Sequence, residues 1–408
     1  MANAASTSAP FDHRAHSILV PSAHSTAAIG VIRSLGAAGY RVHAAAANDD
    51  ALGLKSRFAE RGVVHPPIAS GEFDAWFRDY IARNSIAMIS PGGFDVGASP
   101  VFEDYRDLFT TATDRDVITA TRSKYALFER LLGGDETRQA HLPPSLLVDF
   151  DRGLPAQDDL AALGAPIFIK LDSSEARKAA PSEVIKLADP AAAEAALEQL
   201  RSQYRRTLVQ GFVPGRGAGV FLLRWNGRVV ARMMHLRLHE MPHTGGASSL
   251  RVSWWHDAMM RDAEAKLEAL NWQGVAMVEY RWDQAQDAFY LMEMNLRFWG
   301  SLHLALFAGV DFPRLLADAF FGQVPDRIVE GRIGVVCRNT IPFEIGYLVS
   351  LWRDPQVAAM RKLHSLLEAA WLSLDPRVRN DMLYPGDRML YLRRLREILP
   401  RRGTGRAV

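Results

Sequence analysis

The stretch YLMEMNLRFWGSLHLALFAGVDFP, residues 290–313, places three polar side chains, Glu293, Asn295 and Arg297, at alternate positions of an otherwise apolar strand. Side chains two residues apart on a strand point to the same face of the sheet. These three therefore project together, and the apolar residues between them point to the other face. A carboxylate, an amide oxygen and a guanidinium on one face indicate a site for a cation and an anion together.

The residues before this strand predict the other half of an antiparallel hairpin. In GVAMVEYRW-DQAQD-AFYLMEMNLRF the loop centres near Gln286, and Glu279 and Glu293 are equidistant from that centre. Residues paired in this way have neighbouring side chains. Two opposed carboxylates repel each other unless a cation lies between them. Mg²⁺ suits these carboxylates and the Asn295 oxygen, because nucleotide phosphates and water complete its octahedron. The alternative is a structural pair held by arginines such as Arg281.

Composition limits the class of protein. The 408-residue chain is 48% hydrophobic, carries a formal net charge of +2 and has one cysteine, Cys337. This length permits a large core and two or three lobes. The near-neutral charge provides no global field for nucleic acid. A single cysteine excludes an intramolecular disulfide, and we find no signal peptide and no membrane span, so we predict a soluble cytoplasmic protein.

The N-terminal third alternates between strands and helices. Residues 18–46 predict strand, turn, helix and strand, with Ser25 or Thr26 as the helix cap, and residues 73–83 predict a second helix before the strand in AMISPGGF. This alternation favours a parallel α/β layer. The turn PSAHSTAAIG lacks the G-x-G-x-x-G of dinucleotide sites, so we predict a Rossmann-like lobe without NAD. From residue 206 the pattern predicts antiparallel strands, with Asn226-Gly227 as a hairpin turn and a helix over 257–270.

The hairpin with MEMNLRFWGSLHLALFAGVDFP resembles the metal-binding end of the ATP-grasp superfamily. It is most similar to the carboxylate–amine ligase and carbamoyl-phosphate-synthase-like branch, whose pattern there is Glu-x-Asn-x-Arg. The resemblance covers residues 18–325. It implies an α/β (α+β) fold with four parts: a Rossmann-like pre-ATP-grasp lobe (1–115), a small lid lobe (116–207), a large antiparallel metal-binding lobe (208–330) and a helical, basic C-terminal extension (331–408).

The resemblance also implies roles for individual residues. Glu279, Glu293 and Asn295 would bind the Mg²⁺ ions, or Mn²⁺ in their place, that bridge the phosphates of ATP. Arg297 would hold the transferred phosphate or the substrate carboxylate. Lys170, which ends the strand PIFIK, would reach the α- and β-phosphates, and Lys124 matches the second family lysine. The hinge LVQGFVPG would bind adenine, and its candidate residues are Gln210, Gly211, Phe212 and Val213.

Two departures from the family pattern concern the hinge and the lid. The family usually has a glutamate in or just after the hinge, where this chain has Gly211 and then Arg216. It also usually has a glycine-rich loop after the second lysine, but KLDSSEARKAAPSEVIKL has no glycine from 170 to 187. A lid without glycine cannot wrap phosphates with its backbone amides in the usual way. The candidate side-chain donors in their place are Ser173, Ser174, Arg177 and Lys178.

Residues 239–243 spell HEMPH, which matches the H-E-x-x-H of zinc proteases. We reject a zinc site, because Pro242 and the following Thr-Gly-Gly are incompatible with one continuous helix. The segment HLRLHEMPHTGGASSLRVS instead predicts a loop beside the active site and resembles the family's TGG-x-S loop. Its candidate contacts to an acid or acyl phosphate are His235, Arg237, Ser248 and Arg251.

Two further features lie in or near the C-terminal third. Trp299 follows the metal strand and either closes the substrate pocket or belongs to the core. DRMLYLRRLREILPRRGTGR predicts an amphipathic basic helix that packs onto the body. Its predicted apolar face consists of Met389, Leu392, Leu395 and Leu399.

The resemblance implies an ATP-dependent ligase that acts on small-molecule substrates, a carboxylic acid and an amine. ATP would phosphorylate the acid, and an amine or similar nucleophile would attack the acyl phosphate, with ADP and phosphate as products. The glycine-free lid motivates a second hypothesis, a non-catalytic nucleotide-binding or scaffold protein. A third is a carboxylase-like use of bicarbonate as the acid. A homodimer is common for this architecture.

Overall fold

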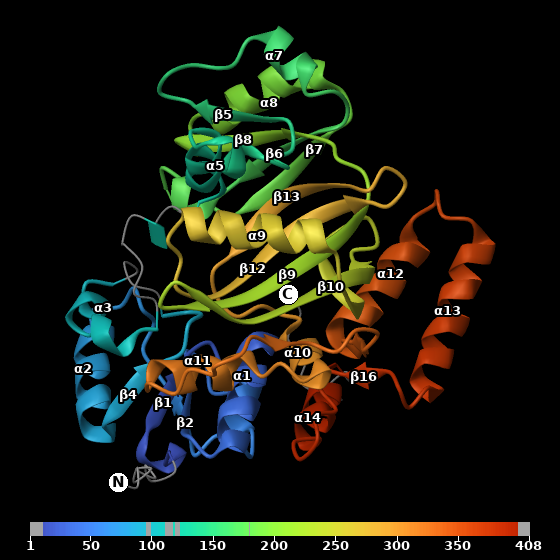
Figure 1. Cartoon of the computed structure of the whole chain (residues 1–408). Helices are drawn as coiled ribbons and strands as arrows, with labels where there is room; N and C mark the ends of the chain where they lie inside the picture. Colours follow the sequence, from blue (N-terminus) through green and yellow to red (C-terminus); the bar gives the residue numbers. More distant parts are fainter. Residues whose placement is uncertain (1–10, 95–98, 111–116, 119–122, 179, 399–408) are drawn as a thin grey trace, which may run out of the picture. The chain divides into compact units, whose positions relative to one another are not determined.

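The computed structural model describes residues 11–94, 99–110, 117–118, 123–178 and 180–398. Its chain, which Figure 1 colours along the sequence, divides into two compact units. Unit 1 comprises the described residues within 1–110, 313–323 and 382–408, and unit 2 those within 111–312 and 324–381. The lid and metal-binding lobes that we predict both lie within unit 2.

Unit 1 contains a parallel sheet with the strand order β3-β2-β1-β4. The strands are β1 (Ser17–Val20), β2 (Arg41–Ala46), β3 (Arg61–Val64) and β4 (Ile86–Ile89), and the helices that follow β1, β3 and β4 in the chain are α1 (Thr26–Ala38), α2 (Phe73–Asn84) and α3 (Val101–Asp104). The Ser25 side chain accepts a hydrogen bond from the backbone N–H of Ala28, which fixes the start of α1. This layer confirms the predicted parallel α/β arrangement.

The end of the chain packs against α1. In unit 1, α11 (Phe312–Phe320) and α14 (Met389–Ile398) accompany the sheet. Arg33 of α1 and Asp387 form a buried ion pair of 2.9 Å, and Ser56 donates a hydrogen bond to the same carboxylate at 2.8 Å. Leu390 packs with Ile29. The basic helix therefore packs onto the body, as predicted.

The predicted apolar face of that helix is wrong. Leu390 is fully buried, whereas Met389 is 60% exposed and Leu392 is 48% exposed. Asp387 lies two residues before α14 and Leu390 lies in its first turn, so the ion pair fixes the chain where it enters the helix and Leu390 packs toward α1. The ion pair to Arg33 thus selects a face that the apolar spacing does not indicate. Leu399 lies outside the described residues.

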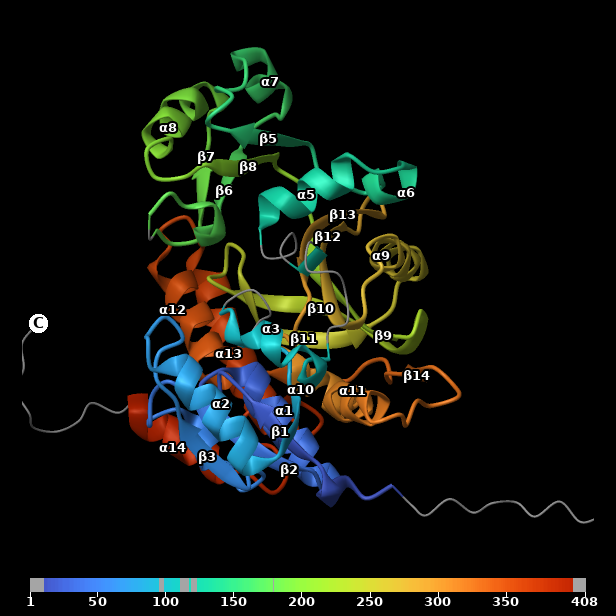
Figure 2. The same cartoon turned by 90° about the vertical axis from the view of Figure 1, so that its left-hand side faces the viewer.

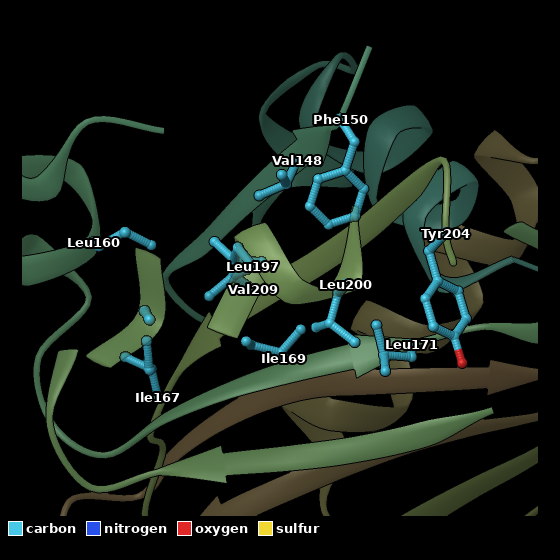
Figure 3. Packing of buried hydrophobic residues seen from close by; sticks show 11 residues of the cluster. Val148, Phe150, Leu160, Ile167, Ile169, Leu171, Leu197, Leu200, Tyr204 and Val209 are labelled. Atoms are coloured by element: carbon cyan, nitrogen blue, oxygen red, sulfur yellow. The ribbon is translucent and has the colours of Figure 1, made fainter. Parts of the chain in front are cut away.

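Unit 2 begins with helices α5 (Lys124–Leu132) and α6 (Glu136–Gln139) and a four-stranded antiparallel sheet of order β5-β8-β6-β7. Its elements are β5 (Ser145–Asp149), α7 (Gln157–Ala162), β6 (Ile167–Leu171), β7 (Glu183–Leu187), α8 (Ala193–Leu200) and β8 (Arg206–Gly211). Figure 3 shows one face of this sheet, where Ile167, Ile169 and Leu171 pack with Leu197 and Leu200 of α8. The alternate residues of β6 therefore project from the opposite face.

The second sheet of unit 2 is larger, with the order β13-β12-β9-β10-β11-β15-β16, and β14 (Val329–Glu330) pairs with β10; β15 is Val336–Arg338 and β16 is Arg379–Asn380. Figure 2 labels its strands from β9 to β14. Its main strands are β9 (Arg216–Trp225), β10 (Arg228–Met241), β11 (Ala247–Trp254), β12 (Gly274–Asp283) and β13 (Ala288–Asn295). Helix α9 (Asp257–Ala269) joins β11 to β12 in the chain, and α10 (Leu302–Ala308) follows β13. Asn226 and Gly227 both have positive φ and form the predicted hairpin turn between β9 and β10.

The segment 235–253, predicted as a loop, is mostly strand. Pairing of β10 with both β9 and β11 leaves only residues 242–246 as the connection. The backbone polar groups of this segment are satisfied within the sheet, which favours strands despite its polar side chains. Arg237 therefore lies on β10, and Ser248 and Arg251 lie on β11.

The C-terminal region contains the predicted helices but also extends the large sheet. Its helices in unit 2 are α12 (Ile345–Arg353) and α13 (Ala359–Leu374), and its strands are β14 (Val329–Glu330), β15 (Val336–Arg338) and β16 (Arg379–Asn380). These strands are only two or three residues long, too short for a periodic pattern to reveal. In the part of the chain that the structure describes, every helix is too short or too polar to cross a membrane.

Candidate nucleotide and metal site

The two predicted carboxylates face each other in unit 2. Glu279 of β12 pairs directly with Glu293 of β13. The next pair toward the turn is Tyr280 with Leu291, so one additional residue, Met292, interrupts the ladder on β13. Such a bulge shifts the register by one position and re-aims the neighbouring side chains. The predicted pairing is confirmed, and the bulge produces it.

Glu279 is held by Arg237, which lies on β10 of the same sheet. Arg237 donates to one Glu279 oxygen at 2.6 Å and to Glu240 at 3.3 Å, and the Asn295 amide donates to the other Glu279 oxygen at 3.3 Å. Burial raises the pKa of Glu279 and the Glu293 charge raises it further, while Arg237 opposes both effects. Arg281, which we considered as the structural partner, lies 3.6 Å from Glu240 instead.

Lys124 lies close to one of these carboxylates, and Lys170 is near enough to both to interact electrostatically. The Lys124 Nζ lies 3.6 Å from a Glu293 oxygen and 3.8 Å from an Asp172 oxygen. Lys170 projects from β6 on the face opposite the lid core. Burial lowers its pKa to about 8; Glu293 and Glu279 raise it, and Lys124 lowers it further. Segments far apart in the sequence thus bring two cations to the carboxylate pair.

Asp172 is a part of this arrangement that the sequence reading missed. It is buried, and one of its oxygens accepts the backbone N–H of Lys124 at 2.7 Å. The Ser123 side chain caps the same helix, α5, by accepting from the backbone N–H of Ala126. Asp172 therefore fixes the start of α5 against the end of β6 and orients Lys124. The available signal was its position two residues after Lys170.

Asn295 is the last residue of β13, so Arg297 lies outside the strand and the predicted alternation ends before it. The two side chains remain adjacent, because Arg297 donates to the Asn295 oxygen at 3.2 Å and to the Phe298 carbonyl at 3.0 Å. Arg297 is exposed. Its guanidinium is therefore accessible to an anion beside the carboxylate pair.

The oxygen atoms of Glu279, Glu293 and Asn295 suit Mg²⁺. Two opposed carboxylates and an amide oxygen are hard ligands that suit this ion, which usually takes few protein oxygens and several from phosphate and water. No cluster of three or more His, Cys, Asp or Glu side chains suited to a metal occurs among the described residues. The residues present fit an ion that shares its ligands with a nucleotide better than one enclosed by protein.

The predicted hinge begins within β8, whose last two residues are Gln210 and Gly211, and continues into the connection that follows. Gln210 donates to the Ser145 hydroxyl at 2.9 Å, and its side-chain oxygen is buried and lacks a hydrogen-bond partner in the described part of the chain. A Cβ on Gly211 would lie 2.4 Å from the Leu163 carbonyl oxygen, so this position requires glycine. Val213 is buried, whereas Phe212 is 48% exposed and stacks with Phe168 at 6.4 Å.

Phe168 is a second residue that the sequence reading missed. It lies on β6 opposite Gln210 and shares the Lys170 face of the sheet. An aromatic pair next to a lysine offers a flat apolar surface beside a cation. This combination suits a heteroaromatic base and its phosphates.

The lid connection is ordered by its own side chains. Ser182 accepts the backbone N–H of Ser173 at 2.9 Å, and Arg177 pairs with Asp151 and donates to two backbone carbonyls. Arg177, one of the proposed phosphate donors, is thus engaged within the lobe. Ser173, Ser174 and Lys178 are exposed.

The remaining candidates differ in their surroundings. Ser248 donates to the Leu250 carbonyl within β11 at 3.3 Å. Arg251 is 1% exposed and forms a buried ion pair with Asp381, so we leave it out of the proposed substrate site. His235 is buried, which lowers its pKa. Trp299 is buried and stacks on Phe221 at 4.4 Å, which supports the core interpretation.

Comparisons with known proteins agree with this architecture. Residues 203–340 match the family model described as "ATP-grasp in the biosynthetic pathway with Ter operon". No curated protein matches the chain. Among solved structures, the fold is similar to the biotin carboxylase domain of 2-oxoglutarate carboxylase from Hydrogenobacter thermophilus, solved with MgADP and bicarbonate (TM-score 0.60, 14% identity, 78% of this chain and 73% of that chain).

Two other solved structures share the fold. N5-carboxyaminoimidazole synthetase from Staphylococcus aureus, solved with ADP, has a TM-score of 0.60 at 12% identity over 79% of this chain and 81% of that chain. L-amino acid ligase from Bacillus licheniformis has a TM-score of 0.52 at 16% identity over 74% and 73%. The architecture is therefore that of ATP-grasp proteins. The ATP-grasp family match covers residues 203–340, which include the predicted hinge and the carboxylate hairpin, and the similarity to the solved structures shows that the chain has the ATP-grasp fold.

Proposed function

We propose that the protein is an ATP-dependent ligase that activates a carboxylic acid as an acyl phosphate and joins it to an amine or a similar nucleophile. The observation that carries this proposal is the meeting of Glu279, Glu293, Lys124 and Lys170 within unit 2. Two carboxylates with two lysines from a second sheet form a site for a metal-bound polyphosphate. Phosphoryl transfer depends mainly on positioning and on neutralising charge, which such a site supplies.

Each residue has a role in this proposal. Glu279, Glu293 and Asn295 would hold Mg²⁺, and when bound the ion would neutralise charge on the ATP phosphates. Lys170 and Lys124 bind phosphate oxygens through their ammonium groups. The base lies by the hinge residues Gln210, Gly211, Phe212 and Val213, next to Phe168.

Arg297 completes the proposed site. Its exposed guanidinium holds the substrate carboxylate or the phosphate in transfer. The acid oxygen attacks the γ-phosphorus, the bond to ADP breaks, and the nucleophile then displaces phosphate from the acyl carbon. No protein nucleophile is required.

Phosphate release from Mg-ATP in the presence of pooled amino acids and small carboxylic acids tests this proposal. We expect release that depends on the pool and that Glu293→Gln abolishes. Glu198→Gln, an exposed carboxylate on α8, is the matched control and should leave the rate unchanged. Substrate-dependent release that Glu293→Gln leaves intact would contradict the assignment of this site.

The ordered, glycine-free lid favours a second candidate, a nucleotide-binding scaffold without turnover. Arg177 is engaged by Asp151, which leaves the lid fewer groups to close over phosphates. Calorimetry separates the candidates: a scaffold binds Mg-ATP but releases no phosphate with any acid. Bicarbonate is a third candidate acid, since two of the matched structures contain it. A bicarbonate requirement for turnover would identify that case.

A further inference from the structure

A polar cavity of about 400 Å³ lies beside Glu279, between β10 and helices α12 and α13 of unit 2. Four arginines, three histidines and two glutamates line it. Arg237 connects the cavity to the proposed metal site, because its guanidinium donates both to Glu279 at 2.6 Å and to Glu240 at 3.3 Å. A molecule in this cavity would therefore lie one side chain away from the carboxylate pair.

Positive charge exceeds negative charge in this cavity. Glu240 lies 3.3 Å from Arg237 and 3.6 Å from Arg281, and Glu368 lies 3.3 Å from His239. Glu240 is thus paired with two arginines, whereas Glu368 faces the His239 ring, whose pKa is lowered by burial. Arg216 and Arg361 also line the cavity, and neither forms an ion pair with the residues that the structure describes.

Buried polar atoms in the lining also lack partners. The Arg237 Nε and the His239 Nδ1 are buried without a hydrogen-bond partner within the described ranges. The His239 ring is fixed by stacking on Tyr347, with ring centroids 4.3 Å apart and planes 7° apart. The Arg237 Nε–H is a buried donor without a partner, which is uncommon, and a bound group that accepts hydrogen bonds would satisfy it.

We propose that this cavity holds an anionic group of the acid substrate, a carboxylate or phosphate separate from the carboxylate that is activated. This inference rests on the proposed ligase function, since it assigns the cavity to the acid. It implies an acid with at least two anionic groups, one beside Arg297 and one facing Arg361. A simple monocarboxylic acid would leave Arg216 and Arg361 of the cavity without an anionic partner.

Calorimetry with glutarate, butyrate and inorganic phosphate as probes, each at saturating MgADP, tests the cavity. We expect glutarate or phosphate to bind at least tenfold more tightly than butyrate, and Arg361→Ala to weaken that binding at least fivefold. Arg353→Ala is the matched control, because Arg353 is exposed on α12 and does not line the cavity. Preference for phosphate over glutarate would identify the group as a phosphate.

Equal binding of the three probes, or equal binding by the wild type and Arg361→Ala, would overturn the inference. Failure of the ligase proposal is distinguished by two further measurements. If the wild type does not bind Mg-ATP, the proposed ligase function is contradicted. The cavity can still be tested in that case, because the probes can be titrated without nucleotide. Mg-ATP binding should be unchanged in Arg361→Ala.

A different observation concerns the outer face of α13. Six large apolar side chains of this helix are 42–79% exposed, namely Met360, Leu363, Leu366, Leu367, Trp371 and Leu374. The polar residues Ser365 and Glu368 instead line the cavity. The helix thus turns its polar side to the protein and its apolar side outward, the reverse of an ordinary surface helix. Figure 1 shows α13 beside α12, the helix it packs against.

The apolar positions have the spacing of a helix–helix interface. Residues 360, 363, 367, 370 and 374 follow the three–four alternation of a heptad seam, with alanine at 370. An antiparallel alignment about Leu367 would set Met360 against the partner's Leu374 and Leu363 against the partner's Trp371. This alignment brings no charged side chain into the seam, so one stripe is complementary to its own copy, as two-fold symmetry requires.

The exposed area is sufficient for a stable interface. If a large apolar side chain offers roughly 200 Å² when fully exposed, the six leave about 700 Å² open on each copy. Two copies would then bury about 1,400 Å², within the range of specific protein–protein interfaces. We infer that α13 pairs with α13 of a second copy of this chain as an antiparallel two-fold interface.

Sedimentation and cross-linking of the full chain test the interface. We expect a dimer at micromolar concentration that Leu367→Glu converts to monomer, because two carboxylates would meet at the axis. Leu392→Glu, at an exposed leucine of α14, should stay dimeric. Leu367→Cys should form a disulfide-linked dimer on mild oxidation, whereas Leu392→Cys should not.

This interface would be overturned if the wild type is monomeric at all concentrations tested. It would also be overturned if Leu367→Glu remains dimeric and Leu367→Cys does not cross-link. Co-flotation with vesicles of phosphatidylcholine and phosphatidylglycerol tests whether a lipid surface, rather than a second copy, covers the apolar face of α13. Monomers that float with vesicles and lose this binding in Leu367→Glu would assign the stripe to lipid instead. These measurements require no nucleotide, so they are independent of the ligase proposal.

Discussion

Raising the pH from 7 to 9 should weaken nucleotide binding because it removes the charge of Lys170. Burial lowers the pKa of Lys170 from 10.5 to about 8. About nine-tenths of the side chain is then charged at pH 7 and about one-tenth at pH 9. If only the ammonium form binds phosphate, the apparent dissociation constant for Mg-ATP rises about tenfold over this range. A lysine with an ordinary pKa would remain charged throughout.

The sign of the effect also predicts proton uptake. Phosphate favours the charged form, so binding raises the pKa of Lys170 and the side chain takes up a proton. At pH 8 this uptake should be about half a proton for each nucleotide bound. Lys170→Arg keeps its charge at all these pH values and should lose both the pH dependence and the proton uptake.

Titration calorimetry with a non-hydrolysable ATP analogue at pH 7, 8 and 9, in buffers of different ionisation enthalpy, measures both quantities. Lys55→Arg, at an exposed lysine of unit 1, is the matched control and should retain the wild-type dependence. A wild-type affinity that stays constant from pH 7 to 9 would refute the reasoning. So would an unchanged pH dependence in Lys170→Arg.

Two further predictions concern the positions that shape unit 2. Gly211→Ala should lower the free energy of unfolding by about 1–3 kcal/mol and weaken ATP binding, because the added Cβ would lie 2.4 Å from a backbone oxygen. Denaturant unfolding measures the change. Gly71→Ala is the control, because a Cβ at position 71 would meet nothing within 4 Å. Arg251→Met should cost about 3–5 kcal/mol by leaving Asp381 buried without its cation, and Asp381→Leu in the same chain should recover most of the loss. Failure of the second change to recover stability would contradict the ion-pair explanation.

The pairing of Glu279 with Glu293 shows what the sequence could and could not predict. Counting from the loop identified the correct pair, yet Asp283 pairs with Ala288 at the turn. Continued without interruption, that register would place Met292 opposite Glu279. The bulge at Met292 restores the pair. Bulges depend on local backbone geometry and leave no regular periodic pattern in the sequence. The carboxylate motif therefore identified the pair correctly, whereas counting residues from the loop did not describe the actual register.

Long-range polar contacts account for most of what the sequence could not predict. Strand and helix positions in unit 1 and the lid follow from periodic apolar residues, which are local signals. The face of α14 depends on Arg33 and Asp387, more than 350 residues apart, and the strands of the 235–253 segment depend on pairing with β9. Neither contact has a local sequence signature.

The carboxylates of the proposed site could be predicted from the sequence, whereas the pairing of these carboxylates with particular cations could not. Glu279 and Glu293 lie on one hairpin, whereas their cations, Arg237, Lys124 and Lys170, come from β10, α5 and β6. Three cations facing two carboxylates keep the pair from repelling itself in the protein alone. If a metal ion neutralises the carboxylates, as we propose, these three side chains would become available to phosphate without rebuilding the site. Preorganised cations of this kind are what phosphoryl transfer requires, and only the fold brings them together.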